Sequence, residues 1–133
     1  INRIDGGVIW KYGDSLISKP EERFYGQHAI HLNKEGEYMI YDNGNVRNRK
    51  TSRALAFRKT DEGFKTTLTI ELPDSLFSWK QGSVYQIDQD RFLFCSSMRK
   101  SIAITDRQGN MLWMAKTDTE FYRAYYLEPS FFD

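Results

Sequence analysis

Short alternations of apolar and polar residues run along almost the whole chain of 133 residues. Alternation with a period of two is typical of strands that bury one face. Clusters of Gly, Asn and Asp separate these segments and favour tight turns, as in Asp61-Glu62-Gly63. The pattern predicts an all-β protein, with at most a helical turn within Asp14–Phe24, where Pro20 disfavours a long helix. The expected strands are Val8–Tyr12, His28–Leu32, Glu37–Tyr41, Arg53–Phe57, Lys65–Leu72, Ser83–Ile87, Arg91–Cys95, Lys100–Thr105, Asn110–Ala115 and Arg123–Leu127.

A recurring frame divides the expected strands into groups of four. An acidic residue, a glycine turn and an apolar run that ends in Trp occur at Asp5–Trp10 and again at Asp106–Trp113. New first strands begin at His28, Ser83 and Arg123, which are 55 and 40 residues apart. Four-stranded antiparallel units at such intervals are typical of β-propeller blades.

This repeat predicts two blades, at about residues 26–73 and 82–117. Residues 1–12 would end a preceding blade and residues 121–128 would form the first strand of the next or closing blade, with Trp10 and Trp113 at equivalent positions on outer strands. Because a propeller has about four to eight blades, we expect residues 1–133 to be part of one larger propeller domain. Two blades alone would expose sheet faces and edges, which favours association into a homo-oligomer.

Composition and charge exclude several other classes of function. Nineteen Lys and Arg residues against 18 Asp and Glu give a net charge of +1, so we expect no nucleic acid and no anionic membrane surface as the main partner. No stretch approaches about 18 consecutive apolar residues, so we expect no membrane span. Cys95 is the only cysteine, which excludes an intrachain disulfide and a multi-cysteine metal site. We expect it to be a small buried core residue.

The candidate chemistry lies at the starts of the first strands. In a propeller these strands line the central channel, so Gln27-His28, Gln81-Gly82-Ser83 and Tyr122-Arg123 are expected to converge. His28 allows two interpretations, an ordinary hydrogen-bonded strand histidine or a functional group that titrates near neutral pH. His31 lies three residues further along the same strand, so the two side chains are expected to point to opposite faces. We therefore expect no paired-histidine metal site there, and no metal elsewhere.

A polar loop follows the second expected strand. Asp42-Asn43-Gly44-Asn45 has the alternating polar groups of a cation loop, but the acidic residue at the twelfth position of a calcium loop is missing, so a turn is the preferred interpretation. We interpret the basic residues that follow as a solvated loop. No glycine-rich phosphate loop, Gly-x-Ser-x-Gly elbow or His-Glu-x-x-His motif occurs. The basic residues are Arg47, Arg49, Lys50 and Arg53.

Four segments together resemble the bacterial arylsulfotransferase (aryl-sulfate sulfotransferase) family. The resemblance runs from about Asp5 to Phe132 and implies that the chain is the C-terminal part of a six-bladed propeller, periplasmic or secreted. It also implies transfer of a sulfuryl group from a phenolic sulfate ester to a phenol, with no nucleotide donor and no cofactor. The four segments are Gly26-Gln27-His28-Ala29, Tyr41-Asp42-Asn43-Gly44-Asn45, Ser52-Arg53-Ala54 and Tyr122-Arg123-Ala124.

The same resemblance implies roles for individual residues. His28 matches the nucleophilic histidine that carries the sulfuryl group between the two phenols. Arg123 is a candidate donor to the sulfuryl oxygens, unless it pairs with Glu120 or Glu128 as a structural tie. Gln27 would orient the imidazole or contact the sulfate, and Ser83 would stand near the position of a family threonine.

Activity of the isolated chain is not expected. The family takes a further histidine and arginine from earlier blades, and this chain has no segment that supplies them. The alternative function is a non-catalytic, secreted or surface propeller that acts as a binding module.

Overall fold

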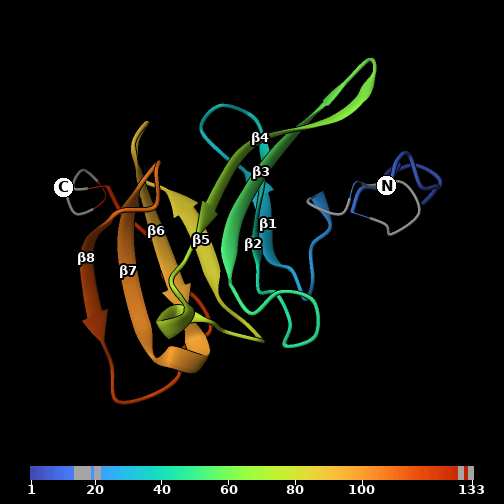
Figure 1. The fold of residues 1–133 in the computed structure, drawn as a ribbon. Coiled ribbons are helices and arrows are strands. Elements are labelled where there is room, and N and C mark those ends of the chain that lie inside the picture. Colours follow the sequence, from blue (N-terminus) through green and yellow to red (C-terminus); the bar gives the residue numbers. More distant parts are fainter. Residues whose placement is uncertain (14–18, 20–21, 129–130, 132–133) are drawn as a thin grey trace.

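Two four-stranded antiparallel sheets make up the molecule, which the computed structural model describes in residues 1–13, 19, 22–128 and 131 (Figure 1). Sheet 1 has the strand order β1-β2-β3-β4 and sheet 2 the order β5-β6-β7-β8, so neighbouring strands are consecutive in the chain. Besides strands, the described residues form only single helical turns, which confirms the all-β prediction. The bounds are β1 (His28–Leu32), β2 (Tyr38–Asp42), β3 (Arg53–Thr60), β4 (Gly63–Glu71), the 3₁₀ turn η2 (Asp74–Leu76), β5 (Ser83–Gln86), β6 (Arg91–Ser96), the 3₁₀ turn η3 (Ser97–Arg99), β7 (Ser101–Asp106) and β8 (Met111–Lys116).

Side-chain oxygens at the turns explain why the chain reverses where the sequence predicts. Oδ1 of Asn33 accepts hydrogen bonds from the backbone N–H of Glu35 at 3.1 Å and of Glu37 at 2.8 Å, between β1 and β2. Oδ1 of Asp106 accepts in the same way from Gln108 and Asn110, between β7 and β8. Such local bonds stabilise a turn without a partner strand. Eight of the ten expected strands form, each within three residues of its expected ends.

An apolar core lies between the two sheets. Alternate residues of β3, such as Ala54 and Ala56, point towards sheet 2, and Val84 of β5 meets them from the other side. β5 contacts both β1 and β2, so the first strands of the two sheets lie side by side (Figure 1). Burial of each large side chain here contributes about 1.5–3 kcal/mol to the free energy of unfolding. The core consists of Met39, Tyr41, Ala54, Ala56, Leu68, Ile70, Leu72, Leu76, Val84, Phe92, Phe94 and Ala103.

The opposite face of sheet 1 is covered by the N-terminal segment, which lies on the side away from sheet 2 (Figure 1). The ring of Tyr12 lies 4.4 Å from that of Phe57, and the ring of Trp10 lies 5.1 Å from that of Tyr38. The expectation of a strand at Val8–Tyr12, with Trp10 matching Trp113 of β8, is therefore wrong. A segment that crosses a sheet face through its side chains has no neighbouring strand with which to form a hydrogen-bonded ladder.

The strand expected at Arg123–Leu127 is also not formed. Residues 121–125 reach β5 and β6 through separate contacts, one of them between the rings of Tyr85 and Tyr125, and not along a hydrogen-bonding edge. The helical turn expected within Asp14–Phe24 lies mostly outside the described residues. Neither sheet closes on itself in the described part of the chain. None of the helices found there has the length or the apolar composition that a membrane crossing requires.

Candidate functional site

His28 is the first residue of β1, and two acceptors hold one nitrogen of its ring. Its Nδ1 lies 2.8 Å from the backbone oxygen of Gly26 and 2.8 Å from Oδ1 of Asn43. The side chain is half-buried. The hydrogen-bonding ability of these two neighbours determines which ring nitrogen carries the proton.

Asn43, directly after β2, is completely buried, and its amide group is held in one orientation. Its Nδ2 donates to the backbone oxygens of Ser78 at 2.6 Å and Gln81 at 2.7 Å. Both amide hydrogens are then used, so Oδ1 faces His28 and can only accept a hydrogen bond. Because the oxygen of Gly26 also only accepts, Nδ1 of His28 must carry the proton, and the neutral imidazole has its lone pair on Nε2. Among the described residues, Nε2 forms no hydrogen bond.

The same network connects β1 to the start of β5. Asn43 reaches Gln81, which precedes Gly82 and Ser83, across the boundary between the sheets. Gly82 has a φ of 105°, and a Cβ there would lie 2.6 Å from Cε1 of Tyr41, so only glycine allows β5 to begin so close to sheet 1.

The third predicted segment, which begins at Tyr122-Arg123, contacts the start of β5. The N–H of Gly82 donates to the oxygen of Tyr122 at 3.3 Å. Oγ of Ser83 donates to the oxygen of Ala124 at 3.4 Å and accepts from its N–H at 3.3 Å. The structure thus brings together the starts of the three segments that the sequence predicts to converge. The hydroxyl of Ser83 is buried and used to hold residues 122–124 beside β5, whereas Gln27 is exposed.

A β-bulge changes the expected directions of the two histidines. His28 pairs with Tyr41 and His31 pairs with Met39, so two residues of β1, Ala29 and Ile30, lie opposite one residue of β2. Ala29, within the bulge, has a φ of 56°. Tyr41 and Met39 point to the same side of their strand, and directly paired residues share a face. The expectation that His28 and His31 point to opposite faces is therefore wrong, because the extra residue restores a common side. No metal-binding group of acidic, histidine or cysteine residues is found in the described part of the chain.

Arg123 lies among tyrosine side chains. Its Nη1 donates to the hydroxyl of Tyr125 at 3.5 Å, and its guanidinium carbon lies 4.9 Å from the centre of the Tyr122 ring. The bond to Tyr125, followed by that to Tyr122, raises the pKa of Arg123, and the guanidinium lowers the pKa of the Tyr125 hydroxyl. Nε of Arg123 is buried and has no hydrogen-bond partner among the described residues.

The structural tie considered for Arg123 is not formed in the described part of the chain. Glu128 pairs with Lys34 instead, at 3.1 Å, and the salt bridges found there do not include Arg123. The guanidinium therefore has donors that no carboxylate of the described residues occupies.

The polar loop after β2 is solvated at Arg47 and Lys50, as expected, but its ends form a buried network. Oδ2 of Asp42 accepts from Nε of Arg53 at 2.9 Å and lies 2.7 Å from Nη2 of Arg49. Oδ1 of Asp42 accepts from the N–H of Tyr25 at 2.8 Å. Asp42 is completely buried, and a buried carboxylate is stable only when it is paired in this way. The interpretation of Arg49 and Arg53 as solvated is wrong, and the turn interpretation of the loop holds.

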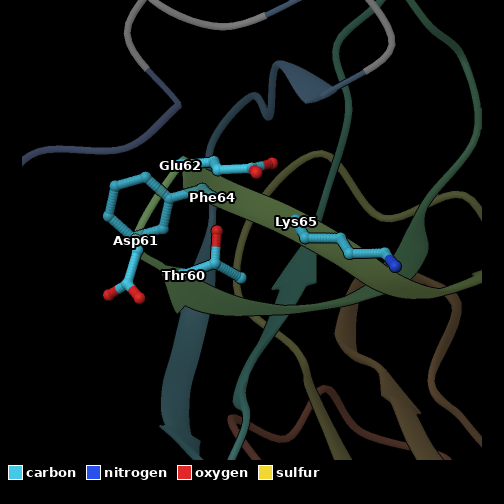
Figure 2. Close-up of a pocket in the computed structure, with 5 residues that line it drawn as sticks. All are labelled: Thr60, Asp61, Glu62, Phe64 and Lys65. Atoms are coloured by element: carbon cyan, nitrogen blue, oxygen red, sulfur yellow. The ribbon is translucent and has the colours of Figure 1, made fainter.

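A hollow of the described surface lies at the end of sheet 1 away from His28. This shallow hollow of about 530 Å³ is lined by Thr60, Asp61, Glu62, Phe64 and Lys65 at the end of the β3–β4 hairpin. Figure 2 shows the charged ends of Asp61 and Lys65 pointing in different directions, so they do not converge on a ligand. Thr60 is six residues along β3 from Ala54, which lies in register with Tyr41 and His28. At about 3.3 Å per residue, this hollow is about 20 Å from the histidine.

Two site features were not predicted from the sequence. Asn43 was assigned to a turn, although its place in a segment that carries the family resemblance is a signal for a further role. Tyr85 and Tyr125 each lie two residues after the expected start of a first strand. This shared position in the repeat is the sequence signal that links them. Cys95 is completely buried as expected, and burial raises the pKa of its thiol to about 12.

Comparison with known proteins adds no assignment. No protein-family model, no curated protein and no solved structure matches the chain.

Proposed function

We propose that this chain is the C-terminal part of a six-bladed propeller enzyme similar to the bacterial arylsulfotransferases, periplasmic or secreted. It transfers a sulfuryl group from a phenolic sulfate ester to a phenol. The observation that carries the proposal is the state of His28, whose Nδ1–H is held by Gly26 and Asn43 while Nε2 keeps a free lone pair. A nucleophilic imidazole needs this arrangement.

The reaction has two balanced steps. Nε2 of His28 attacks the sulfur in line, a nitrogen–sulfur bond forms, and the bond from sulfur to the ester oxygen breaks, releasing the donor as a phenolate. The oxygen of an acceptor phenol then attacks the same sulfur, the nitrogen–sulfur bond breaks, and the imidazole is restored. The proton lost by the acceptor balances the one taken up by the donor phenolate. Such a double displacement gives ping-pong kinetics.

The surrounding groups stabilise the sulfo-histidine. The ring becomes positively charged when Nε2 is substituted, and the oxygens of Gly26 and Asn43 both accept from its remaining N–H. Arg123 is proposed to contact the sulfuryl oxygens, because its planar fork suits such groups and its Nε is not used by another residue of the described chain. Gln27 is exposed next to His28 and is proposed to contact the substrate, whereas Ser83 is proposed to act through its buried hydroxyl, which holds the segment that carries Arg123.

Two features of the fold support the propeller part of the proposal. The sheets are successive four-stranded meanders, and the first strand of sheet 2 lies against the first two strands of sheet 1. Residues 122–124 in turn lie beside the start of β5, through their hydrogen bonds to Gly82 and Ser83. Three chain segments therefore lie in a row, as the first strands of neighbouring blades do.

A labelling experiment tests the nucleophile. The full-length protein that contains this chain is mixed with a phenyl sulfate carrying ³⁵S, and the label that remains on protein is mapped to a residue. We expect label on His28 and its loss in His28→Ala. The matched control is His31→Ala, which alters the other histidine of the chain and is expected to keep the label at saturating donor. Label that persists in His28→Ala would remove the assignment.

The role of Arg123 is tested by Arg123→Lys in the same full-length protein. A hydrogen-bond donor that stabilises the charge of the transferring group typically accelerates a reaction by a factor of about 10²–10³. We expect the turnover of 4-nitrophenyl sulfate to fall by a large part of this factor, with little change in melting temperature, since no salt bridge to Arg123 is lost. The control is Arg107→Lys, which alters an arginine that donates to the backbone oxygen of Gln89 on an exposed turn. A fall in melting temperature at full turnover would show that Arg123 is structural.

A second candidate function is a non-catalytic binding module. The observation that favours it is that the hollows at the end of the β3–β4 hairpin are not lined by His28, Gln27 or Asn43. The two functions differ in one measurement. A binding module retains phenyl sulfate in equilibrium binding and never releases the phenol.

A further inference from the structure

Three rings form a continuous row across the first strands. The rings of His31 and Tyr85 are 4.8 Å apart at an angle of 36°, and the rings of Tyr85 and Tyr125 are 5.0 Å apart at 35°. One ring comes from β1, one from β5 and one from the segment that follows β8. Separations in this range are those of attractive aromatic pairs.

The row has a free end that faces solvent. Tyr125 is 62% exposed, whereas Tyr85 and His31 are half-buried. Nδ1 of His31 lies 2.9 Å from the oxygen of Ala29, so this ring is fixed and supports Tyr85 from behind. A planar ligand can therefore stack at the Tyr125 end, where the described residues leave this ring exposed.

Charge favours an aromatic ligand with an anionic substituent. Arg123 donates to the hydroxyl of Tyr125, and its buried Nε has no hydrogen-bond partner in the described residues. The guanidinium is thus placed beside the exposed ring of the row, where it can contact a negative group while the ring of the ligand stacks.

The strand register relates the row to the end of the sheets at which His28 lies. Tyr85 stands two residues after Ser83 on β5, and the bulge makes His31 equivalent to two positions after His28. Two strand residues span about 7 Å.

We propose that Tyr85 and Tyr125, with His31 behind them, bind the aromatic ring of the phenolic substrate while Arg123 faces its sulfate. This inference rests on the proposed sulfuryl transfer for the position of the sulfur. The ring-binding site itself depends only on the row of side chains, so it is testable separately.

The first experiment measures steady-state kinetics of the full-length protein with 4-nitrophenyl sulfate. A lost aromatic contact changes affinity by about three- to tenfold, so Tyr85→Leu and Tyr125→Leu are each expected to raise KM by this factor with little change in kcat. Tyr125→Phe keeps the ring, so its KM is expected to remain within about twofold of the wild-type KM. The matched control is Tyr126→Leu, because Tyr126 is the neighbouring tyrosine, is 42% exposed and lies outside the row.

The second experiment separates this inference from the proposed nucleophile. Phenyl sulfate and cyclohexyl sulfate, which carry six-membered rings that are aromatic and saturated respectively, are titrated into the His28→Ala protein by calorimetry. We expect tighter binding of phenyl sulfate, and loss of this preference in the double variants with Tyr85→Leu or Tyr125→Leu. Equal binding of the two esters, or an equal effect of Tyr126→Leu, would overturn the ring-binding site even if His28 proves to be the nucleophile. Turnover that persists in His28→Ala would overturn the nucleophile and leave the binding result to stand alone.

Discussion

Removal of the Asn43 side chain is expected to destabilise the protein far more than a loss of one polar residue from a loop usually does. The amide makes three hydrogen bonds, to Nδ1 of His28 at 2.8 Å and to the backbone oxygens of Ser78 at 2.6 Å and Gln81 at 2.7 Å. It is completely buried, so water does not replace these bonds in Asn43→Ala.

The magnitude follows from the number of bonds. Each hydrogen bond contributes about 0.5–1.5 kcal/mol net, and a buried group left without a partner costs more. Three bonds give an expected loss of about 2–4 kcal/mol in the free energy of unfolding. With a urea dependence of about 2 kcal/mol per molar, the midpoint of unfolding falls by about 1–2 M.

Urea unfolding followed by tryptophan fluorescence measures this effect. The matched control is Asn48→Ala, which removes the same side chain from an exposed position of the same loop. Its expected effect is within about 0.5 kcal/mol, as is usual for surface substitutions. Equal midpoints for Asn43→Ala and Asn48→Ala would refute the conclusion that Asn43 connects the two sheets and holds the ring of His28.

Four further outcomes are expected. In ¹⁵N NMR spectra, the neutral ring of His28 should carry its proton on Nδ1, and an Nε2–H tautomer would contradict the proposed nucleophile. The thiol of Cys95 should resist alkylation in the native protein at pH 8, and because burial raises its pKa from 9.0 to about 12, its contribution to stability should be full below pH 9 and decline as the pH rises towards 12 in unfolding measurements. Asp42→Ala removes the buried carboxylate that pairs with Arg49 and Arg53 and should cost about 3–5 kcal/mol in urea unfolding, against almost nothing for the exposed Asp61→Ala. Gly82→Ala should lower the melting temperature, because a Cβ there would lie 2.7 Å from the oxygen of Cys95.

The sequence by itself determined the class of the fold and most of its strands. Period-two alternation sets which residues of a strand share a face, and side chains such as Asn33 and Asp106 form their turns through local hydrogen bonds. These are interactions between residues close in the chain, so they are readable from the pattern alone. The burial of Cys95 follows from its place in an apolar strand.

The tertiary structure alone decided where the segments at the two ends lie. Residues 8–12 and 123–127 have the alternation of strands, but a strand also needs a free sheet edge, and each of these segments contacts a sheet through side chains or separate bonds. The alternation of apolar and polar residues shows that a segment can form a strand, but it does not show whether a sheet edge is available to pair with it.

The details of the site were decided in the same way. The bulge at Ala29 reverses the expected direction of His31, because one unpaired residue shifts every later side chain to the other face. Asn43 determines the proton position on His28 only because Ser78 and Gln81, distant in sequence, use both of its amide hydrogens. Such long-range hydrogen bonds depend on how the sheets pack, and no local pattern in the chain specifies them.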